Sequence, residues 1–269
     1  MKPSYSSLRY LGVLCLSAIF IHTSSSIVRG DDAAPASSIP TWAFAPSPDD
    51  FKDSALLDLS SLNEKEAGQS GFVKVDANGA FVLGDGKPAR FWAINSSYKK
   101  EDMANHAHFM AKRGVNLVRI FFPIDNPKGT DPNGIDSAER DWCWKLEAAL
   151  KKEGIYCLIT PYWATSTHLP PAWGIAPGPN GSAMGIVFFD PKLQDAYKAW
   201  MKALFAEPNP YDPNKLPLAQ DPAVAIIQLQ NEDSLLFWTF NGMPAEQRAN
   251  LGKLFGAWLA KKYGSIDKA

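Results

Sequence analysis

The sequence predicts an α/β protein built as an incomplete (β/α)8 TIM barrel, about the first four strand–helix units, preceded by a β-hairpin. Apolar strands alternate with amphipathic helices, which is the pattern of right-handed β-α-β units and a parallel sheet. Long loops follow the strands, whereas the links after Arg113 and Glu153 are short and begin with glycine. This asymmetry is typical of a barrel with its functional loops on one face. A doubly wound sheet is the alternative, and the lack of a glycine-rich turn after Asn95 counts against it.

A hairpin opens the predicted fold. Residues 72–75 and 80–83 are short apolar strands, and the Asn78-Gly79 pair between them is a strong turn signal. The segment 89–95 then predicts the first strand of the parallel sheet, with Asn95 at its carboxyl end.

The remaining units follow in order. The pattern predicts strands at 115–122, 155–163 and 224–230, and helices at 101–113, 138–153, 190–205 and 244–263. Asp190 and Pro191 suit the N-cap and first position of the third helix. The last helix carries one apolar stripe, made of Leu251, Leu254, Phe255, Trp258 and Leu259.

The fourth strand ends in a polar run that carries the strongest functional signal. Residues 224–229 are mostly apolar and rich in β-branched residues, and Gln230, Asn231, Glu232 and Asp233 follow directly. Ligands and catalytic groups gather at this end of the strands in α/β folds. A glutamate among apolar neighbours can donate a proton, and the asparagine before it can bind a substrate hydroxyl. The simpler alternative is that Asn231 and Asp233 only cap the start of a helix.

Three segments together resemble clan A glycoside hydrolases, specifically the cellulase and mannanase family 5. They are residues 90–95, 116–119 and 230–232, and the resemblance extends over about residues 70–263. It implies that Glu232 is the general acid/base, that Asn231 holds a sugar 2-hydroxyl, and that Arg119 orients and ionises the nucleophilic carboxylate. For Arg119 the alternative is an ion pair inside the barrel core.

Further residues are expected to bind the sugar. The substrate-binding candidates are Asn95, Trp163, His168, Trp173 and Trp238. The sequence contains nine Trp, and indole rings suit sugar faces, but tryptophan is also ordinary core material. For His168 and the three tryptophans, a core or loop role remains the alternative.

The sequence departs from the family pattern in two respects. Asp233 stands where the family usually has proline after the Asn-Glu pair. The family's nucleophile is a glutamate after the seventh strand, whereas only four units are predicted here, so no residue of this sequence is assigned that role. We therefore expect residues 51–269 to be the N-terminal part of a longer catalytic domain that is inactive alone. The rival hypothesis is a non-catalytic carbohydrate-binding or scaffold protein on a partial barrel.

Composition limits the partners. The formal net charge of −1 counts against nucleic acid and against anionic membrane surfaces. The four histidines, at 22, 106, 108 and 168, do not form a metal-binding set, so we expect no metal or other cofactor. A carbohydrate substrate is the expected partner.

The amino terminus reads as an export signal. Basic residues precede an apolar stretch over 10–21 that is too short to span a bilayer, and a small residue, Gly30, follows. Residues 1–30 are therefore predicted to be a signal peptide and 31–50 a linker, which predicts secretion. Cys143 and Cys157 remain after cleavage; two buried free thiols are favoured, and one disulfide is the alternative.

Overall fold

The computed structural model describes residues 49, 52, 57–99 and 101–269. The chain divides after residue 48, and the second unit, Asp49–Ala269, contains all the described residues. The predicted signal peptide, residues 1–30, and the predicted linker, residues 31–50 apart from Asp49, lie outside the described residues. No helix in the described part is long and apolar enough to cross a membrane.

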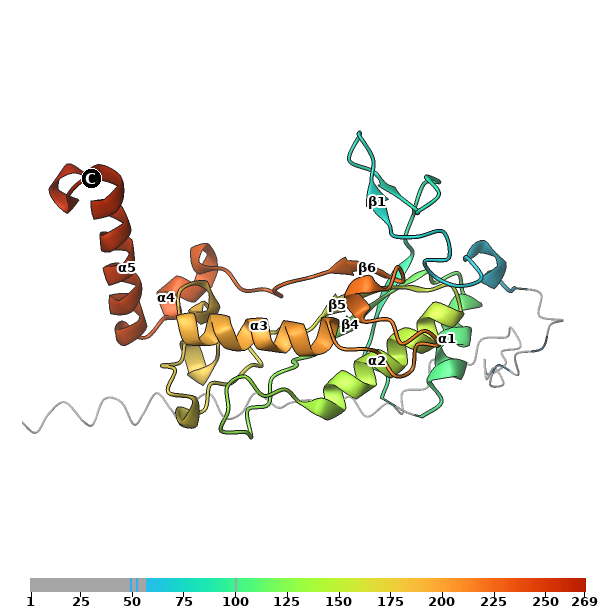
Figure 1. The fold of residues 1–269 in the computed structure, drawn as a ribbon, viewed down its shortest axis with the longest axis horizontal. Coiled ribbons are helices and arrows are strands. Elements are labelled where there is room, and N and C mark those ends of the chain that lie inside the picture. The colour runs from blue at the N-terminus through green and yellow to red at the C-terminus, as the bar shows by residue number, and fades with distance from the viewer. Residues whose placement is uncertain (1–48, 50–51, 53–56, 100) are drawn as a thin grey trace, which may run out of the picture. The chain divides into compact units, whose positions relative to one another are not determined.

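A four-stranded parallel sheet lies at the centre of the second unit, as predicted (Figure 1). The strands run in chain order β3-β4-β5-β6 and are Ala93–Ser96, Leu117–Phe121, Tyr156–Thr160 and Val224–Ile227. Each strand therefore lies beside its neighbour in sequence, which is the arrangement of successive β-α-β units. Strand β6 is shorter than the predicted 224–230, although the Gln228 N–H still donates to the Ile159 carbonyl at 3.0 Å.

Three helices cover one face of the sheet, and their bounds are α1 Met103–Ala111, α2 Ser137–Lys152 and α3 Pro191–Phe205. Their apolar sides pack on the strand residues Val118, Ile120 and Ile159, all fully buried. The predicted start of α3 is confirmed, because the Asp190 carboxylate accepts from the Leu193 N–H at 3.0 Å. Cys143 and Cys157 are buried free thiols in this layer, as favoured from the sequence, and burial raises the pKa of both.

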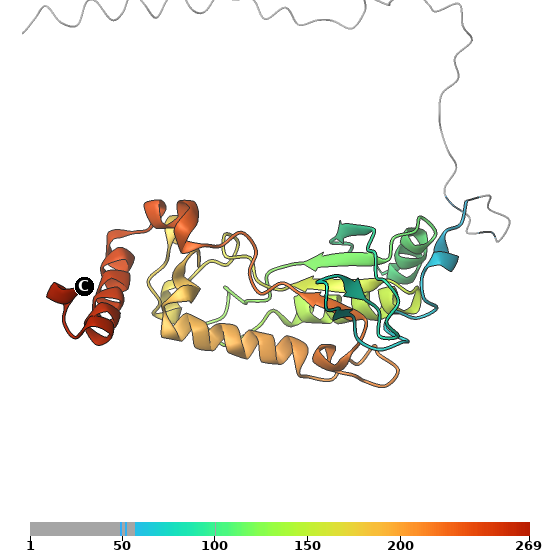
Figure 2. The same cartoon turned by 90° about the horizontal axis from the view of Figure 1, so that it is seen from above.

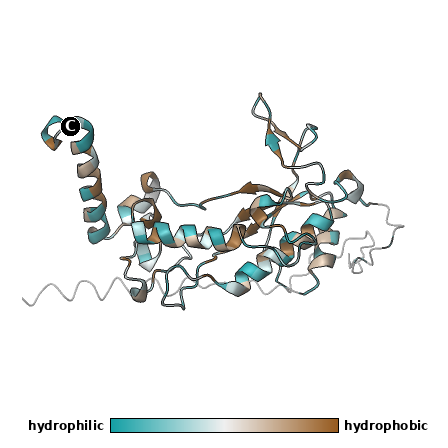
Figure 3. Ribbon diagram, in the orientation of Figure 1, coloured by the Kyte–Doolittle hydropathy of each residue, from teal (hydrophilic) through white to brown (hydrophobic). Residues whose placement is uncertain are grey.

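The amino-terminal segment covers part of the other face. The hairpin is formed as predicted, by β1 Lys74–Val75 and β2 Phe81–Val82 in antiparallel pairing. Behind it a second, smaller core cluster joins Leu117 and Tyr156 of the sheet to Ala67, with Phe91 against them. Strand residues appear brown between more hydrophilic helix surfaces in Figure 3. Closer to the carboxyl ends of the strands this face carries polar residues instead.

The helix of the fourth unit does not cover the sheet. Helix α5, Ala245–Tyr263, follows a short α4, Phe240–Gly242, and both views place it at the end of the molecule away from β1 and β2 (Figures 1 and 2). Its apolar stripe includes Leu254, Phe255 and Trp258, which are 51%, 57% and 50% exposed. The helix was predicted at the right place, but its stripe does not pack against β6.

Short helical turns complete the second unit, at Ser60–Leu62, Pro171–Trp173, Pro179–Gly181, Ile186–Phe188, Leu218–Gln220, Leu235–Thr239 and Ile266–Lys268. Most lie in the long connections that follow β5 and β6. These connections carry most of the candidate site.

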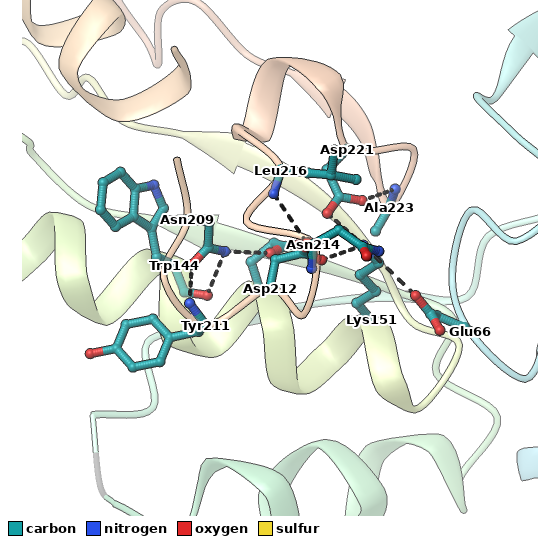
Figure 4. Close-up of polar contacts among 11 residues, drawn as sticks. Glu66, Trp144, Lys151, Asn209, Tyr211, Asp212, Asn214, Leu216, Asp221 and Ala223 are labelled. Carbon is teal, nitrogen blue, oxygen red and sulfur yellow. Dashed lines mark hydrogen bonds and ion pairs between the residues drawn. The ribbon is translucent and has the colours of Figure 1, made fainter. Parts of the chain in front are cut away.

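A buried ionic cluster anchors the loop before β6 (Figure 4). The Lys151 ammonium on α2 lies 2.7 Å from carboxylate oxygens of both Asp212 and Asp221. Burial alone would lower the pKa of Lys151, but its hydrogen bonds to these two carboxylates raise it above the ordinary value. Because Lys151 precedes β5 and Asp221 precedes β6, the cluster lies near the amino ends of the strands. In (β/α)8 barrels, residues at the amino ends of the strands mainly serve stability.

Candidate active site at the carboxyl edge of the sheet

Arg119 of β4 is the centre of a polar network on the open face of the sheet. Its Nε donates to Thr160 Oγ1 at 3.1 Å, and its Nη2 donates to Gln228 Oε1 at 2.8 Å and to Asn231 Oδ1 at 2.6 Å. Its guanidinium carbon lies 4.4 Å from the centre of the Phe121 ring, within cation–π range. These contacts fix a half-buried cation between three successive strands.

Asn231 is buried beneath this network. It is 7% exposed, and its backbone forms an isolated parallel bridge with Trp163, beyond the end of β5. The Trp163 ring packs on Phe121 at a centroid distance of 4.8 Å. The arginine, the asparagine and the tryptophan predicted from the sequence therefore come together at one edge.

Glu232 follows Asn231 at this edge. Its side chain is exposed, and its backbone is left-handed, with φ of 51°. Residues other than glycine seldom adopt this conformation, because the Cβ atom crowds the following carbonyl. The neighbours on either side therefore have to hold it in place.

Asp233 is held by a different part of the chain. Both of its carboxylate oxygens accept from the Gly185 N–H, at 2.9 and 3.1 Å. Burial raises the pKa of Asp233 to about 6, and the Gly185 N–H opposes that shift. The helical turn after it is capped by Ser234, whose hydroxyl accepts from the Leu236 N–H. Asn231 and Asp233 are thus engaged elsewhere, which contradicts the interpretation of both as helix caps.

The remaining predicted sugar-binding residues are distributed more widely. Asn95 pairs in register with Arg119 and is exposed at the edge of the sheet, so it belongs with the group above. His168 is exposed and lines a separate cavity of about 280 Å³ with Thr165, Asn180 and Thr239. Trp173 is 4% exposed and its indole N–H donates to the Gly129 carbonyl, so it lies in the core. The side chain of Trp238 lies outside the described residues.

The structure is similar to mannanases and mannosidases of glycoside hydrolase family 5. The match to an endo-1,4-β-mannanase from Rhizomucor miehei covers 60% of this chain and 48% of the mannanase chain, at 16% identity and a TM-score of 0.44. The match to a family 5 mannosidase from the same organism, solved with mannosyl-fructose, covers 68% of this chain and 53% of the mannosidase chain, at 14% identity and a TM-score of 0.46.

The match to an exo-β-1,4-mannosidase from Opitutaceae bacterium strain TAV5 covers 48% of this chain and 24% of the mannosidase chain, at 17% identity and a TM-score of 0.38. The chain thus spans about half the length of the two fungal enzymes. No protein-family model matches the sequence, and no curated protein matches it either.

Sequence reasoning missed three members of this site. Gln228 and Thr160 both bind Arg119, and Thr160 Oγ1 also donates to Gln228 Oε1 at 3.0 Å. A polar residue after an otherwise apolar strand, two positions beyond the register of the charged Arg119, is the signal that could have identified Gln228. Asp233 was noted only as a possible helix cap and as a departure from the family pattern, because its partner Gly185 is remote in sequence.

Proposed function

We propose that this protein supplies the acid/base side of the active site of a secreted retaining glycoside hydrolase acting on β-linked saccharides. One observation carries the proposal. The Arg119–Asn231 hydrogen bond of 2.6 Å sets Asn231 at the carboxyl edge of the sheet, with Glu232 exposed beside it and Trp163 paired to it. An arginine, an amide, a carboxyl and an indole at one edge form a set suited to binding and cleaving a sugar.

Glu232 is the proton donor and acceptor of the proposed reaction. In the first step its carboxylic acid protonates the departing glycosidic oxygen while a second carboxylate attacks the anomeric carbon. In the second step its carboxylate takes a proton from water, which attacks the glycosyl-enzyme and releases the sugar. Exposure of Glu232 at the edge leaves it accessible to both the substrate and water.

Asn231 and Trp163 position the sugar. Because the Asn231 Oδ1 accepts from Arg119, its amide nitrogen is the atom left to donate to a sugar hydroxyl. The Trp163 ring is half-buried beside it, and its buried indole N–H has no hydrogen-bond partner among the described residues. Asn231 therefore retains a donor that the folded chain does not use.

Arg119 is suited to hold the second carboxylate anionic. Its Nε and Nη2 are occupied by the network, whereas Nη1 has no hydrogen-bond partner in the described part of the chain. A guanidinium next to a carboxylate lowers its pKa and binds it in a defined geometry. We assign the nucleophile to no residue of this sequence. Export through residues 1–30 completes the proposal and places the enzyme where polysaccharides are found.

The direct test is hydrolysis of β-mannan, β-glucan and their oligosaccharides by the full-length gene product. We expect turnover of at least one of them, and Glu232→Gln should lower it by on the order of 10²- to 10⁴-fold, because the leaving oxygen is no longer protonated. The exposed Glu246→Gln on α5 is the matched control and should retain full turnover. Saccharide binding without turnover in the wild type would favour the non-catalytic alternative.

A further inference from the structure

The residues on either side of Glu232 are tied to two different parts of the fold. On one side Asn231 accepts from Arg119 and pairs with Trp163. On the other side Asp233 accepts from the Gly185 N–H through both oxygens. The left-handed backbone of Glu232 lies between these ties and is a strained conformation for a residue other than glycine. Such a conformation persists only where the surroundings fix it.

Gly185 is placed to make this contact. Its own φ is +74°, and a Cβ atom there would lie 2.7 Å from Thr239 Cγ2 and 2.9 Å from Met243 Cε. The residue must therefore be glycine for the loop to approach this closely. The loop belongs to the long connection between β5 and α3, so the Asp233–Gly185 contact joins the connections that follow two successive strands.

A helix-capping role does not account for Asp233. The helical turn at Leu235–Thr239 is capped by the Ser234 hydroxyl, so the Asp233 carboxylate is not the cap of that turn. It is instead half-buried against a loop remote in sequence. Burying a carboxylate costs free energy, and that cost is expected where the contact has a purpose beyond local folding.

We propose that Asp233 is the positioning residue for Glu232. By accepting a hydrogen bond from the Gly185 N–H, Asp233 fixes the backbone that directs the Glu232 carboxyl toward the substrate. This inference rests on the proposed function, because Asp233 acts through Glu232 and does not touch the substrate itself.

The contact is also sensitive to pH. Tyr162, a buried residue of the segment after β5, is a titratable group that interacts electrostatically with Asp233, and its hydroxyl has no partner among the described residues. The pKa of Asp233 is raised to about 6 by burial, so its carboxyl gains a proton below that pH. A protonated carboxyl accepts less strongly from an N–H than a carboxylate does, so the Gly185 contact weakens in mild acid.

The first experiment follows the Gly185 amide resonance of the ¹⁵N-labelled full chain during a pH titration. We expect it to shift with a midpoint near the Asp233 value of about 6, and we expect Asp233→Asn to abolish that transition while preserving the fold. Asp190→Asn is the matched control, because Asp190 also accepts from a backbone N–H, that of Leu193, and should leave the Gly185 titration intact. A Gly185 amide that does not titrate, or that titrates equally in Asp233→Asn, overturns the proposal.

The second experiment measures turnover in the same variants of the full-length gene product. Asp233→Ala should lower kcat by on the order of 10²-fold with little change in KM, because a misplaced acid slows the chemical step. Asp233→Asn should restore most of kcat through its amide oxygen and remove the acid-side dependence near pH 6. Unchanged kcat in Asp233→Ala overturns the positioning role. A normal Gly185 titration without any wild-type turnover overturns the proposed function, and with it the catalytic role of the contact.

Discussion

At the scale of single residues, the same arginine contributes to both folding and the proposed chemistry. Arg119 donates to the amide oxygens of Gln228 and Asn231; Gln228 also accepts from Thr160, whereas the Asn231 oxygen has no other donor among the described residues. A buried acceptor left without a donor costs about 1–3 kcal/mol, so the arginine stabilises the site it serves. Lysine could not replace it, because one ammonium cannot reach three acceptors in this forked geometry.

Glu147 provides a residue-scale prediction about stability and pH. It is fully buried on α2, where only one of its oxygens has a partner, the Asn209 amide at 3.0 Å, and burial raises its pKa from 4.5 to about 8. Its pKa is raised on folding, so its contribution to stability is complete below pH 4.5 and is lost as pH rises through about 8. Glu147→Gln should therefore match the wild type near pH 4.5 and exceed it by about 1–3 kcal/mol near pH 8.

Denaturant unfolding at several pH values measures this difference. The exposed Glu101→Gln is the control and should follow the wild-type curve throughout. Parallel curves for the wild type and Glu147→Gln would show that Glu147 is already ionised in the folded protein.

The sequence predicted where several candidate residues lie better than it predicted their contacts. Arg119, Asn231, Trp163 and Asn95 meet as their strand positions required, because parallel strands end at one edge. Trp173 could not be separated from core tryptophans, since its indole partner is a backbone carbonyl in a loop. Contacts that join distant loops, such as Asp233 with Gly185, leave no periodic pattern to read.

At the scale of elements, local signals were reliable where capping and turn chemistry act over a few residues. Asp190 caps α3 as expected, and the Asn78-Gly79 turn closes the hairpin. Helix α5 was predicted from its period, but period alone does not say what its stripe contacts. Packing depends on neighbours, and helix α5 lies away from the sheet with its apolar stripe exposed.

The exposed stripe of α5 leads to an element-scale prediction. The rings of Phe255 and Trp258 stack at a centroid distance of 5.9 Å, and the two residues are 57% and 50% exposed. Contiguous exposed apolar surface promotes association, so the described unit should self-associate as concentration rises. The double variant Phe255→Ser and Trp258→Ser should reduce association and change the unfolding free energy by no more than about 0.5 kcal/mol.

Light scattering during size-exclusion chromatography, together with denaturant unfolding, tests this prediction. Lys253→Ser, an exposed polar position on the same helix, is the control and should leave association unchanged. A loss of several kcal/mol in the double variant would show instead that the stripe packs within the folded chain.

At the scale of the whole molecule, the described sheet has two open edges. Strands β3 and β6 are paired on one side only among the described residues, and Ile94 and Ile227 on their helix-facing sides are 38% and 42% exposed. Unpaired parallel edges with apolar flanks favour further pairing. The alternation of strands and helices was enough to predict the sheet order, because each crossover follows one handedness.

The central claim is that Glu232 is the general acid/base, and substrates with graded leaving groups test it most directly. In the full-length gene product, Glu232→Ala should lose far more turnover on poor leaving groups than on activated aryl β-glycosides, which hardly need protonation to depart. With an activated substrate, azide should restore turnover and yield a glycosyl azide, because azide attacks the glycosyl-enzyme without a general base. Equal losses on both substrate types, with no effect of azide, would contradict the assignment of Glu232.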